Sequence, residues 1–169
     1  MKTRYRLGLA VLAVFAAGFL LPERALIPVQ AADRSDWHPR SFWYEPWGRS
    51  GVHKGIDIFA REGVPVLAAT PGIVIFEEQL PMGGNVVGVL GPRWRVHYYA
   101  HLRESNAGFL VGKGERIGSV GTTGNAAGKP PHLHYAVISL LPLPWRASGE
   151  TQGWKKMFFL DPSRLLAGD

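Results

Sequence analysis

Two histidine motifs in this sequence combine residue types and spacings that could hold a metal ion. The first is His53-Lys-Gly-Ile-Asp57, in which an imidazole and a carboxylate lie four positions apart. On an extended strand these side chains would stand about 13 Å apart, so they can share an ion only if the chain bends, and Gly55 is placed to allow a bend. The alternative is a loop histidine beside an exposed aspartate, and this motif taken alone favours that alternative.

The second motif is His132-Leu-His134, which begins an apolar run that ends at Ile138. Residues two apart on a strand point to the same face, about 6 to 7 Å from each other. One imidazole could therefore bind a metal while the other overhangs a vacant coordination position. This would suit a catalytic zinc, which keeps three protein ligands and one site for water. Two half-exposed strand histidines without a metal explain this pair equally well when it is taken alone.

The other histidines differ in their expected roles. His101 lies near the end of a predicted strand, where it is expected to share a face with Tyr99. A single histidine near a strand end is more often a surface residue than a catalyst. His97 would lie on that same face about 13 Å farther along, and we interpret it as structural. His38 stands outside the β-rich region and has the weakest claim to a function.

The composition narrows the chemistry further. The chain of 169 residues has no cysteine, which excludes disulfides, thiol catalysis and cysteine-ligated zinc, so any metal must bind histidine and carboxylate side chains. The formal charge is +6, but residues 1–32 hold four of the 19 basic side chains and only one of the 13 acidic ones. The remaining body is weakly basic and has no recognisable nucleic-acid motif, so we expect no nucleic-acid partner.

The elements expected to position these residues are short strands separated by Gly and Pro. Five runs rich in β-branched or aromatic residues indicate strands: 72–77, 85–90, 94–102, 116–120 and 132–138. Gly91-Pro-Arg93 joins two of them at hairpin spacing, and no window of a dozen residues in this region has a helical period. The sequence therefore predicts an antiparallel, mainly β domain.

Irregular segments flank the β-rich region. Residues 33–48 form a lead segment rich in aromatic side chains, which Pro39 and Pro46 prevent from being one regular element. We expect these aromatics to pack across the domain, with lining of a substrate cleft as the alternative. Residues 140–169 are interpreted as a loop and a short apolar closing segment. The core of the protein is accordingly assigned to residues 49–139.

The N-terminal residues follow the pattern of an export signal. Three basic side chains precede an uncharged run over residues 7–21: Lys2, Arg4 and Arg6. As a helix, this run would span roughly 22 Å, less than the hydrocarbon core of a bilayer, which favours a signal peptide in residues 1–32. Ala31-Ala32 offers a cleavage site, and an uncleaved anchor in the inner membrane is the alternative. Either way the rest of the chain is expected in the periplasm or cell envelope.

Several linked motifs in one order give the region from Trp47 to Ser139 a close resemblance to a known family. Besides the two histidine motifs they are Trp47-Gly-Arg49, Gly63-Val-Pro-Val-Leu-Ala68, Gly72-Ile-Val74, Gly83-Gly-Asn85, Tyr98-Tyr-Ala-His101-Leu102, Gly112-Lys-Gly-Glu-Arg-Ile-Gly118 and Gly121-Thr-Thr-Gly124. This pattern resembles the lysostaphin-like or LytM-type zinc metallopeptidases of bacterial cell walls, metallopeptidase family 23. The resemblance implies a single antiparallel β-sheet or sandwich domain of the duplicated hybrid motif type, with a groove that holds the zinc site.

The resemblance also implies a role for each histidine of the motifs. His53, Asp57 and His134 match the family's ligands to one Zn²⁺ per chain. His101 and His132 match the two histidines that flank the zinc-activated water, where one acts as the base. The spacing does not indicate which of the two is the base. The absence of His-Glu-x-x-His excludes the helical protease design in which a glutamate has that role.

The sequence thus predicts an exported zinc metalloendopeptidase that hydrolyses peptide bonds in peptidoglycan stem peptides or cross-links. The alternative is a non-catalytic scaffold of the same fold that binds the wall or activates a hydrolase, and the presence of all five residues favours the enzyme. The expected partners are peptidoglycan peptides, with membrane attachment through residues 7–21 if the signal is retained. The bond that is cleaved and the oligomeric state are not encoded in any recognisable motif.

Overall fold

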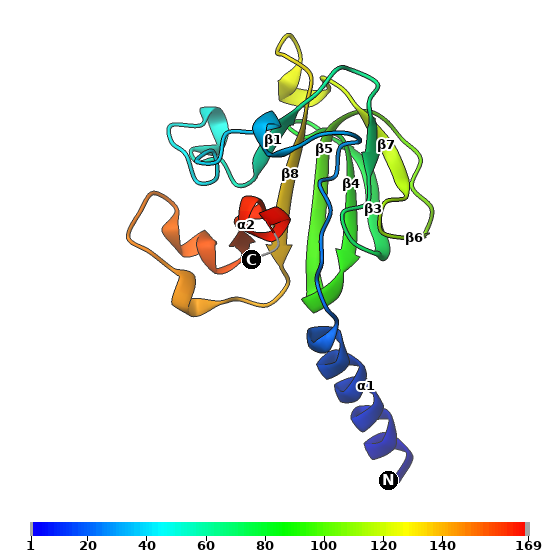
Figure 1. The fold of residues 1–169 in the computed structure, drawn as a ribbon. Coiled ribbons are helices and arrows are strands. Elements are labelled where there is room, and N and C mark those ends of the chain that lie inside the picture. Colours follow the sequence, from blue (N-terminus) through cyan, green and yellow to red (C-terminus); the bar gives the residue numbers. More distant parts are fainter. Residues whose placement is uncertain (1, 168–169) are drawn as a thin grey trace.

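The computed structural model describes the backbone of residues 2–167 and the side chains of residues 5–167 (Figure 1). The side chains of Lys2 and Arg4, in the expected cationic flank, and residues 168–169 lie outside this part. Within it, nine strands form one antiparallel sheet. The strands are β1 (Ile56–Phe59), β2 (Pro65–Leu67), β3 (Gly72–Leu80), β4 (Gly84–Gly91), β5 (Arg95–Ser105), β6 (Leu110–Val111), β7 (Arg116–Val120), β8 (His132–Ser139) and β9 (Phe159–Leu160). The helices are α1 (Lys2–Leu20) and α2 (Pro162–Ala167).

The order of the strands places β5 and β8 near the middle of the sheet. The main path runs β1-β8-β5-β4-β3-β6, while β7 pairs with β5 and β2, and β9 pairs with β8. The predicted antiparallel, mainly β architecture is confirmed. The five predicted strands correspond to β3, β4, β5, β7 and β8, and a short 3-10 turn at Pro92–Trp94 closes the predicted hairpin between β4 and β5.

The sequence did not predict β1, β2, β6 and β9. None of these strands is longer than four residues. A run this short holds too few alternations to show a period of two, so tertiary pairing rather than local pattern defines it. The sequence also did not predict helix α2, because its six residues make fewer than two helical turns and show no helical period.

Alternation along β8 separates the core from the histidine motif. Leu133 and Tyr135 are fully buried in the hydrophobic core, together with Tyr99 of β5. Because successive strand residues point to opposite faces, His132 and His134 project from the other face of the same strand. The apolar packing that fixes β8 thereby fixes the positions of both imidazoles.

Residues 22–32 leave α1 and pack against the domain. Three backbone hydrogen bonds of 3.0 Å join them to the region around β2: Leu26 N to Ala69 O, Gln30 N to Pro65 O and Leu67 N to Pro28 O. Val29 is buried and forms a β-bridge with Val66. The candidate cleavage site Ala31-Ala32 therefore comes directly after residues that are part of the folded domain.

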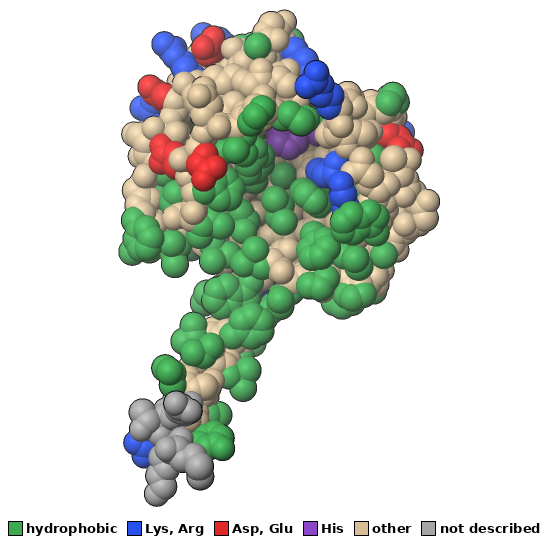
Figure 2. All heavy atoms as spheres, turned by 180° about the vertical axis from the view of Figure 1, so that it is seen from behind, with side chains coloured by type: hydrophobic (Ala, Val, Ile, Leu, Met, Phe, Trp, Pro, Cys, Tyr) green, Lys and Arg blue, Asp and Glu red, His purple; other side chains and the backbone are tan. Residues whose placement is uncertain are grey.

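Helix α1 itself projects from the domain with apolar side chains around its circumference (Figure 2). It contacts the domain at the Pro92–Trp94 turn, where the ring of Phe15 stacks on that of Trp94 at 5.7 Å. Among the described helices, none combines the length and the apolar character needed to cross a bilayer.

The aromatic lead segment and the C-terminal segment lie on the same side of the sheet, next to β1 and β8 (Figure 1). The indole Nε1 of Trp43 donates to Thr151 O at 3.1 Å, and Gln152 Nε2 donates to Ser50 O at 2.8 Å. Trp37 and Trp43 are buried, as the packing interpretation predicted. Trp47, in contrast, lines the pocket described below.

Candidate metal centre

Strand register brings the two halves of the predicted metal motif together. In the antiparallel pair of β1 and β8, Asp57 is the direct partner of His134, and Phe59 is the partner of His132. Side chains that face each other across such a pair lie close together on the same face of the sheet. The carboxylate and the imidazole therefore meet although 77 residues separate them in the chain.

His53 completes the group from the irregular chain just before β1. Its Nε2 lies 3.1 Å from Asp57 Oδ1 and 3.1 Å from His134 Nδ1, and the last two atoms are 2.8 Å apart. Three donor atoms thus converge on one point, and these residues form a group able to hold a metal ion. Ligand atoms at about 2.0–2.1 Å from a tetrahedral zinc are about 3.3 Å apart, so the donor set and its spacing fit zinc.

Gly55 allows the turn between His53 and Asp57, but for a reason the sequence did not indicate. The chain bends at Gly55. A Cβ at this position would lie 2.5 Å from Tyr135 O and 2.9 Å from the His134 ring. Strand β8 passes so close to Gly55 that no larger residue fits there. The glycine is therefore needed for space rather than for flexibility.

The lead segment orients the His53 ring. His53 Nδ1 lies 2.9 Å from Ser41 O, and a carbonyl can only accept, so the ring proton is on Nδ1 and Nε2 is free to bind. The indole of Trp47 stacks on this imidazole at 4.1 Å between ring centroids. Hydrogen bonding of the second ring nitrogen to a backbone carbonyl is the usual support of a metal-binding histidine.

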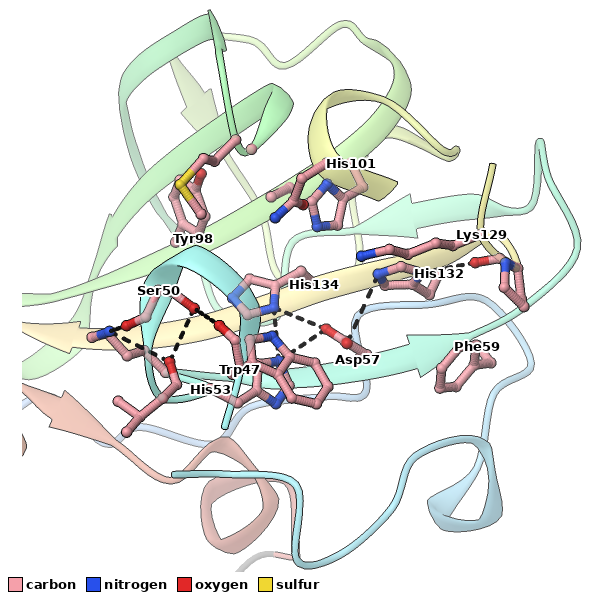
Figure 3. A pocket seen from close by; sticks show the side chains of 17 residues that line it. Trp47, Ser50, His53, Asp57, Phe59, Tyr98, His101, Lys129, His132 and His134 are labelled. Carbon is pink, nitrogen blue, oxygen red and sulfur yellow. Dashed lines mark hydrogen bonds and ion pairs between the residues drawn. The ribbon is translucent and has the colours of Figure 1, made fainter. Parts of the chain in front are cut away.

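His101 and His132 stand beside this group (Figure 3). Their ring centroids are 5.0 Å apart, and His132 Nε2 lies 3.9 Å from Asp57 Oδ2. His132 Nδ1 lies 2.8 Å from Pro130 O, and His101 Nδ1 lies 2.9 Å from Thr123 O. Both rings therefore carry their proton on Nδ1, which leaves Nε2 as an acceptor.

The expectation that His101 shares a face with Tyr99 is wrong. Tyr99 points into the core, whereas His101 lines the pocket together with Tyr98. The pairing of β4 and β5 shifts register between Asn85 and Val87, and His101 has a φ of 65°. This bulge reverses the alternation and turns the imidazole toward the pocket. A hydrogen bond of 2.8 Å from His101 N to Gly83 O holds the conformation.

Comparison with known proteins identifies the family of this chain. The model of Peptidase family M23 matches residues 51–141, more than half of the chain. The chain belongs to peptidase family M23. Its M23 region contains all five residues of the site.

Individual relatives agree with this assignment. An L-Ala--D-Glu endopeptidase of Bacillus subtilis is 38% identical in an alignment over 115 residues that covers 62% of this chain and 35% of the relative. The present chain therefore spans only about a third of the length of that protein. The catalytic domain of lysostaphin from Staphylococcus simulans is 27% identical over 72% of this chain and 85% of that chain, with a TM-score of 0.57. A zinc-containing peptidase of Vibrio cholerae is 32% identical over 68% of this chain and 37% of that chain, with a TM-score of 0.54.

Burial and contacts set the charge states in this M23 site. Burial alone would raise the pKa of Asp57, but hydrogen bonds to His134 and His53 hold it well below its usual range. Burial, and after it the charges of His134 and His132, lowers the pKa of His101 to about 4. His101 is therefore neutral at pH 7, and its Nε2 lone pair can accept a proton.

The site forms one wall of a pocket of about 450 Å³. Besides the five site residues, the side chains of Trp47, Lys54, Phe59, Tyr98, Asn125 and Lys129 line it. Burial raises the pKa of Tyr98 to about 12, so its hydroxyl stays a hydrogen-bond donor. Lys129 extends along His132 over the pocket (Figure 3). Sequence reasoning missed the supporting carbonyls of Ser41, Thr123 and Pro130, because backbone groups carry no residue-type signal.

The two remaining histidines lie outside this pocket. His97 is fully buried, and its Nδ1 lies 2.7 Å from the Tyr135 hydroxyl, which agrees with the structural role expected for it. His38 is exposed in the lead segment. The histidines that line the pocket are thus the four singled out from the sequence.

Proposed function

We propose that this protein is a zinc-dependent endopeptidase of the cell envelope that hydrolyses peptide bonds in peptidoglycan. One observation carries the proposal: the donor atoms of His53, Asp57 and His134 converge beside two histidines whose Nε2 atoms are free. Membership of family M23 supports peptide-bond hydrolysis, and the names of the relatives support a wall substrate.

His53, Asp57 and His134 would hold the zinc. Two imidazoles and one carboxylate suit Zn²⁺ and leave one position open, which is the arrangement of catalytic rather than structural sites. When bound, zinc would supply Lewis-acid activation of water and of the scissile carbonyl. The Asp57 carboxylate is ready for this role without losing a proton, because its pKa lies well below neutrality.

His101 and His132 would move the protons of the reaction. Water attacks the scissile carbonyl carbon, and Nε2 of one of the two rings accepts its proton. The same proton then passes to the amine nitrogen as the C–N bond breaks. The hydrogen bonds from Nδ1 to Thr123 O and Pro130 O keep both rings in the tautomer that can accept at Nε2.

The uncharged run of residues 7–21 behind a basic flank supports export of the catalytic region. Export is required because the peptidoglycan substrate lies outside the cytoplasm. The pocket also suits a peptide with free carboxylates, because Lys54 and Lys129 line it and Asp57 is its one acidic residue among those described.

Digestion of purified sacculi tests the proposed function. Zinc-loaded full-length protein should release new amino termini, and mass spectrometry of the fragments then identifies the bond. Asp57→Asn should release none, whereas Glu78→Gln, an exposed carboxylate on β3, should act as the wild type does. Zinc-loaded wild type that binds sacculi but releases no amine would refute the proposal and favour the scaffold.

A further inference from the structure

A second hollow of about 370 Å³ lies between the lead segment and the C-terminal segment. Nine side chains line it: Arg40, Phe42, Trp43, Tyr44, Arg146, Glu150, Lys156, Asp161 and Arg164. We call it the arginine-lined hollow. It shares no lining residue with the catalytic pocket.

The hollow holds more positive charge than its own acids neutralise. Lys156 is paired with Glu150, and Arg164 Nε lies 3.8 Å from Asp161 Oδ2. Within residues 5–167, Arg40 and Arg146 form no ion pair with a carboxylate. Two guanidinium groups are therefore left to attract an anion from outside the chain.

Arg146 is held in place but not neutralised. Its Nε donates to Lys156 O at 3.2 Å, which leaves the terminal nitrogens of the guanidinium group free. Burial, and after it the charge of Arg164, lowers the pKa of Arg146, and the charge of Asp161 offsets only part of this effect. A half-buried cation beside another cation has an energetic cost that a bound carboxylate would offset.

One wall of the hollow is aromatic. Trp43 is buried, and the ammonium group of Lys156 lies 5.3 Å from the centre of its ring. Tyr44 is 55% exposed and offers a flat apolar surface. A ligand here would thus have a charged group for the arginines and an apolar part for the rings.

The same aromatic segment also supports the metal site. Trp43 N donates to His53 O at 2.7 Å, and Ser41 O accepts from His53 Nδ1 at 2.9 Å. A single stretch of chain thus contacts the metal motif and lines the hollow. A polymer that lies in the catalytic pocket could place a neighbouring group in the hollow.

We propose that the arginine-lined hollow binds a carboxylate of a peptidoglycan stem peptide, as a second subsite next to the catalytic pocket. The proposal rests on the function proposed above. A guanidinium fork matches the two oxygens of a carboxylate. Four basic and two acidic side chains line the hollow, so its net charge of +2 suits a single carboxylate better than a polymer of closely spaced phosphates.

Indole signals in ¹⁵N-resolved NMR spectra test this proposal, because Trp43 reports on the hollow and Trp47 on the catalytic pocket. Full-length protein carrying His101→Ala, which would leave the ligand intact, is titrated with a stem tetrapeptide that has free carboxylates. The Trp43 signal should shift. Arg40→Gln with Arg146→Gln should weaken the affinity seen at Trp43 about tenfold or more. Arg93→Gln, at an exposed site elsewhere, should leave it unchanged.

Four further outcomes are decisive. A tetrapeptide with amidated carboxylates should bind as weakly to the parent protein as the free peptide does to the double variant. Equal affinity of the double variant and the parent protein for the free peptide, or a larger Trp43 shift with a glycerol phosphate oligomer, would overturn the proposal. A Trp43 shift together with a wild type that releases no amine from sacculi would refute the proposed function alone and keep the hollow as a peptide-binding site.

Discussion

The ring nitrogens of the four pocket histidines divide them into two kinds. His53 and His134 direct a nitrogen at Asp57 Oδ1, at 3.1 and 2.8 Å. His101 and His132 instead stand to the side, each with Nδ1 bound to a backbone carbonyl and Nε2 free. Loss of a residue of the first kind should remove the metal, whereas loss of the second kind should remove proton transfer and leave the metal bound.

We expect His101→Ala to separate these two effects. Its peptide hydrolysis should fall by about 10²- to 10⁴-fold, the usual contribution of a general acid or base. Its zinc content should stay at the wild-type level, because His101 is not among the three converging donors. Atomic absorption and amine release measure the two quantities on one sample, with Asp57→Asn as the variant that loses both. Loss of zinc in His101→Ala would show that the division is wrong.

Trp47 is expected to matter through the His53 ring on which it stacks. Trp47→Ala should weaken zinc binding by about 10- to 100-fold, the range found when support for a ligand is removed. Trp47→Phe should restore most of the affinity, since it keeps an aromatic face. Competition with a chromogenic chelator gives these constants. Trp145→Ala, at a tryptophan that is 79% exposed, serves as control, and an effect equal to that of Trp47→Ala would contradict the stacking role.

At the level of strands, β1 and β8 build the site through their register. Pairing of Asp57 with His134 is a long-range event, and β1 itself is only four residues long. The sequence could predict β8 and its pair of histidines, because a β-branched and aromatic run marks the strand. It could not predict the partner strand or the register from local pattern. Only the family resemblance therefore joined Asp57 and His134 in one predicted metal site.

The bulge in β5 shows a second limit of prediction from sequence. Strict alternation puts His101 on the core side with Tyr99. The actual position depends on a left-handed backbone conformation at His101. Hydrogen bonds from His101 to Gly83 O and Thr123 O stabilise this conformation. These partners are remote in sequence and act through backbone atoms. The family resemblance therefore identified His101 as a candidate, while its orientation follows from the tertiary fold.

Close packing of β1 on β8 makes Gly55 a sensitive position. In Gly55→Ala the new methyl group would meet Tyr135 O and the His134 ring, so one of the strands must shift. We expect a loss of about 1–3 kcal/mol in the free energy of unfolding, together with weaker zinc binding. Urea denaturation followed by circular dichroism measures the first effect. Gly149→Ala, where nothing lies within 4 Å, is the matched control, and equal stability of the two variants would contradict the packing argument.

For the molecule as a whole, the chain on both sides of the M23 region contributes to the fold. The lead segment orients the His53 ring through Ser41 O, and the C-terminal segment packs against the lead segment at Trp43. Residues 22–32 add backbone pairing with β2, and the buried Glu23 side chain contacts Arg95 and His97. The folded unit thus begins before the candidate cleavage site at Ala31-Ala32.

Two truncations test this contribution. Removal of residues 1–21 should leave the domain folded, whereas removal of residues 1–32 should cost at least about 2 kcal/mol of stability, because the burial of Val29 and three backbone hydrogen bonds are lost. Thermal denaturation of the two proteins gives the comparison. Equal melting temperatures would mean that residues 22–32 add nothing to the fold.

Metal reconstitution tests the central claim most directly. Chelator-treated full-length protein is titrated with zinc while amine release from sacculi is followed, with Asp57→Asn in parallel. Activity should be absent without zinc, rise linearly and level off at one zinc per chain, and Asp57→Asn should stay inactive throughout. Hydrolysis by the metal-free protein at the rate of the reconstituted one, or full activity of Asp57→Asn, would contradict the assignment of His53, Asp57 and His134 as the catalytic zinc site.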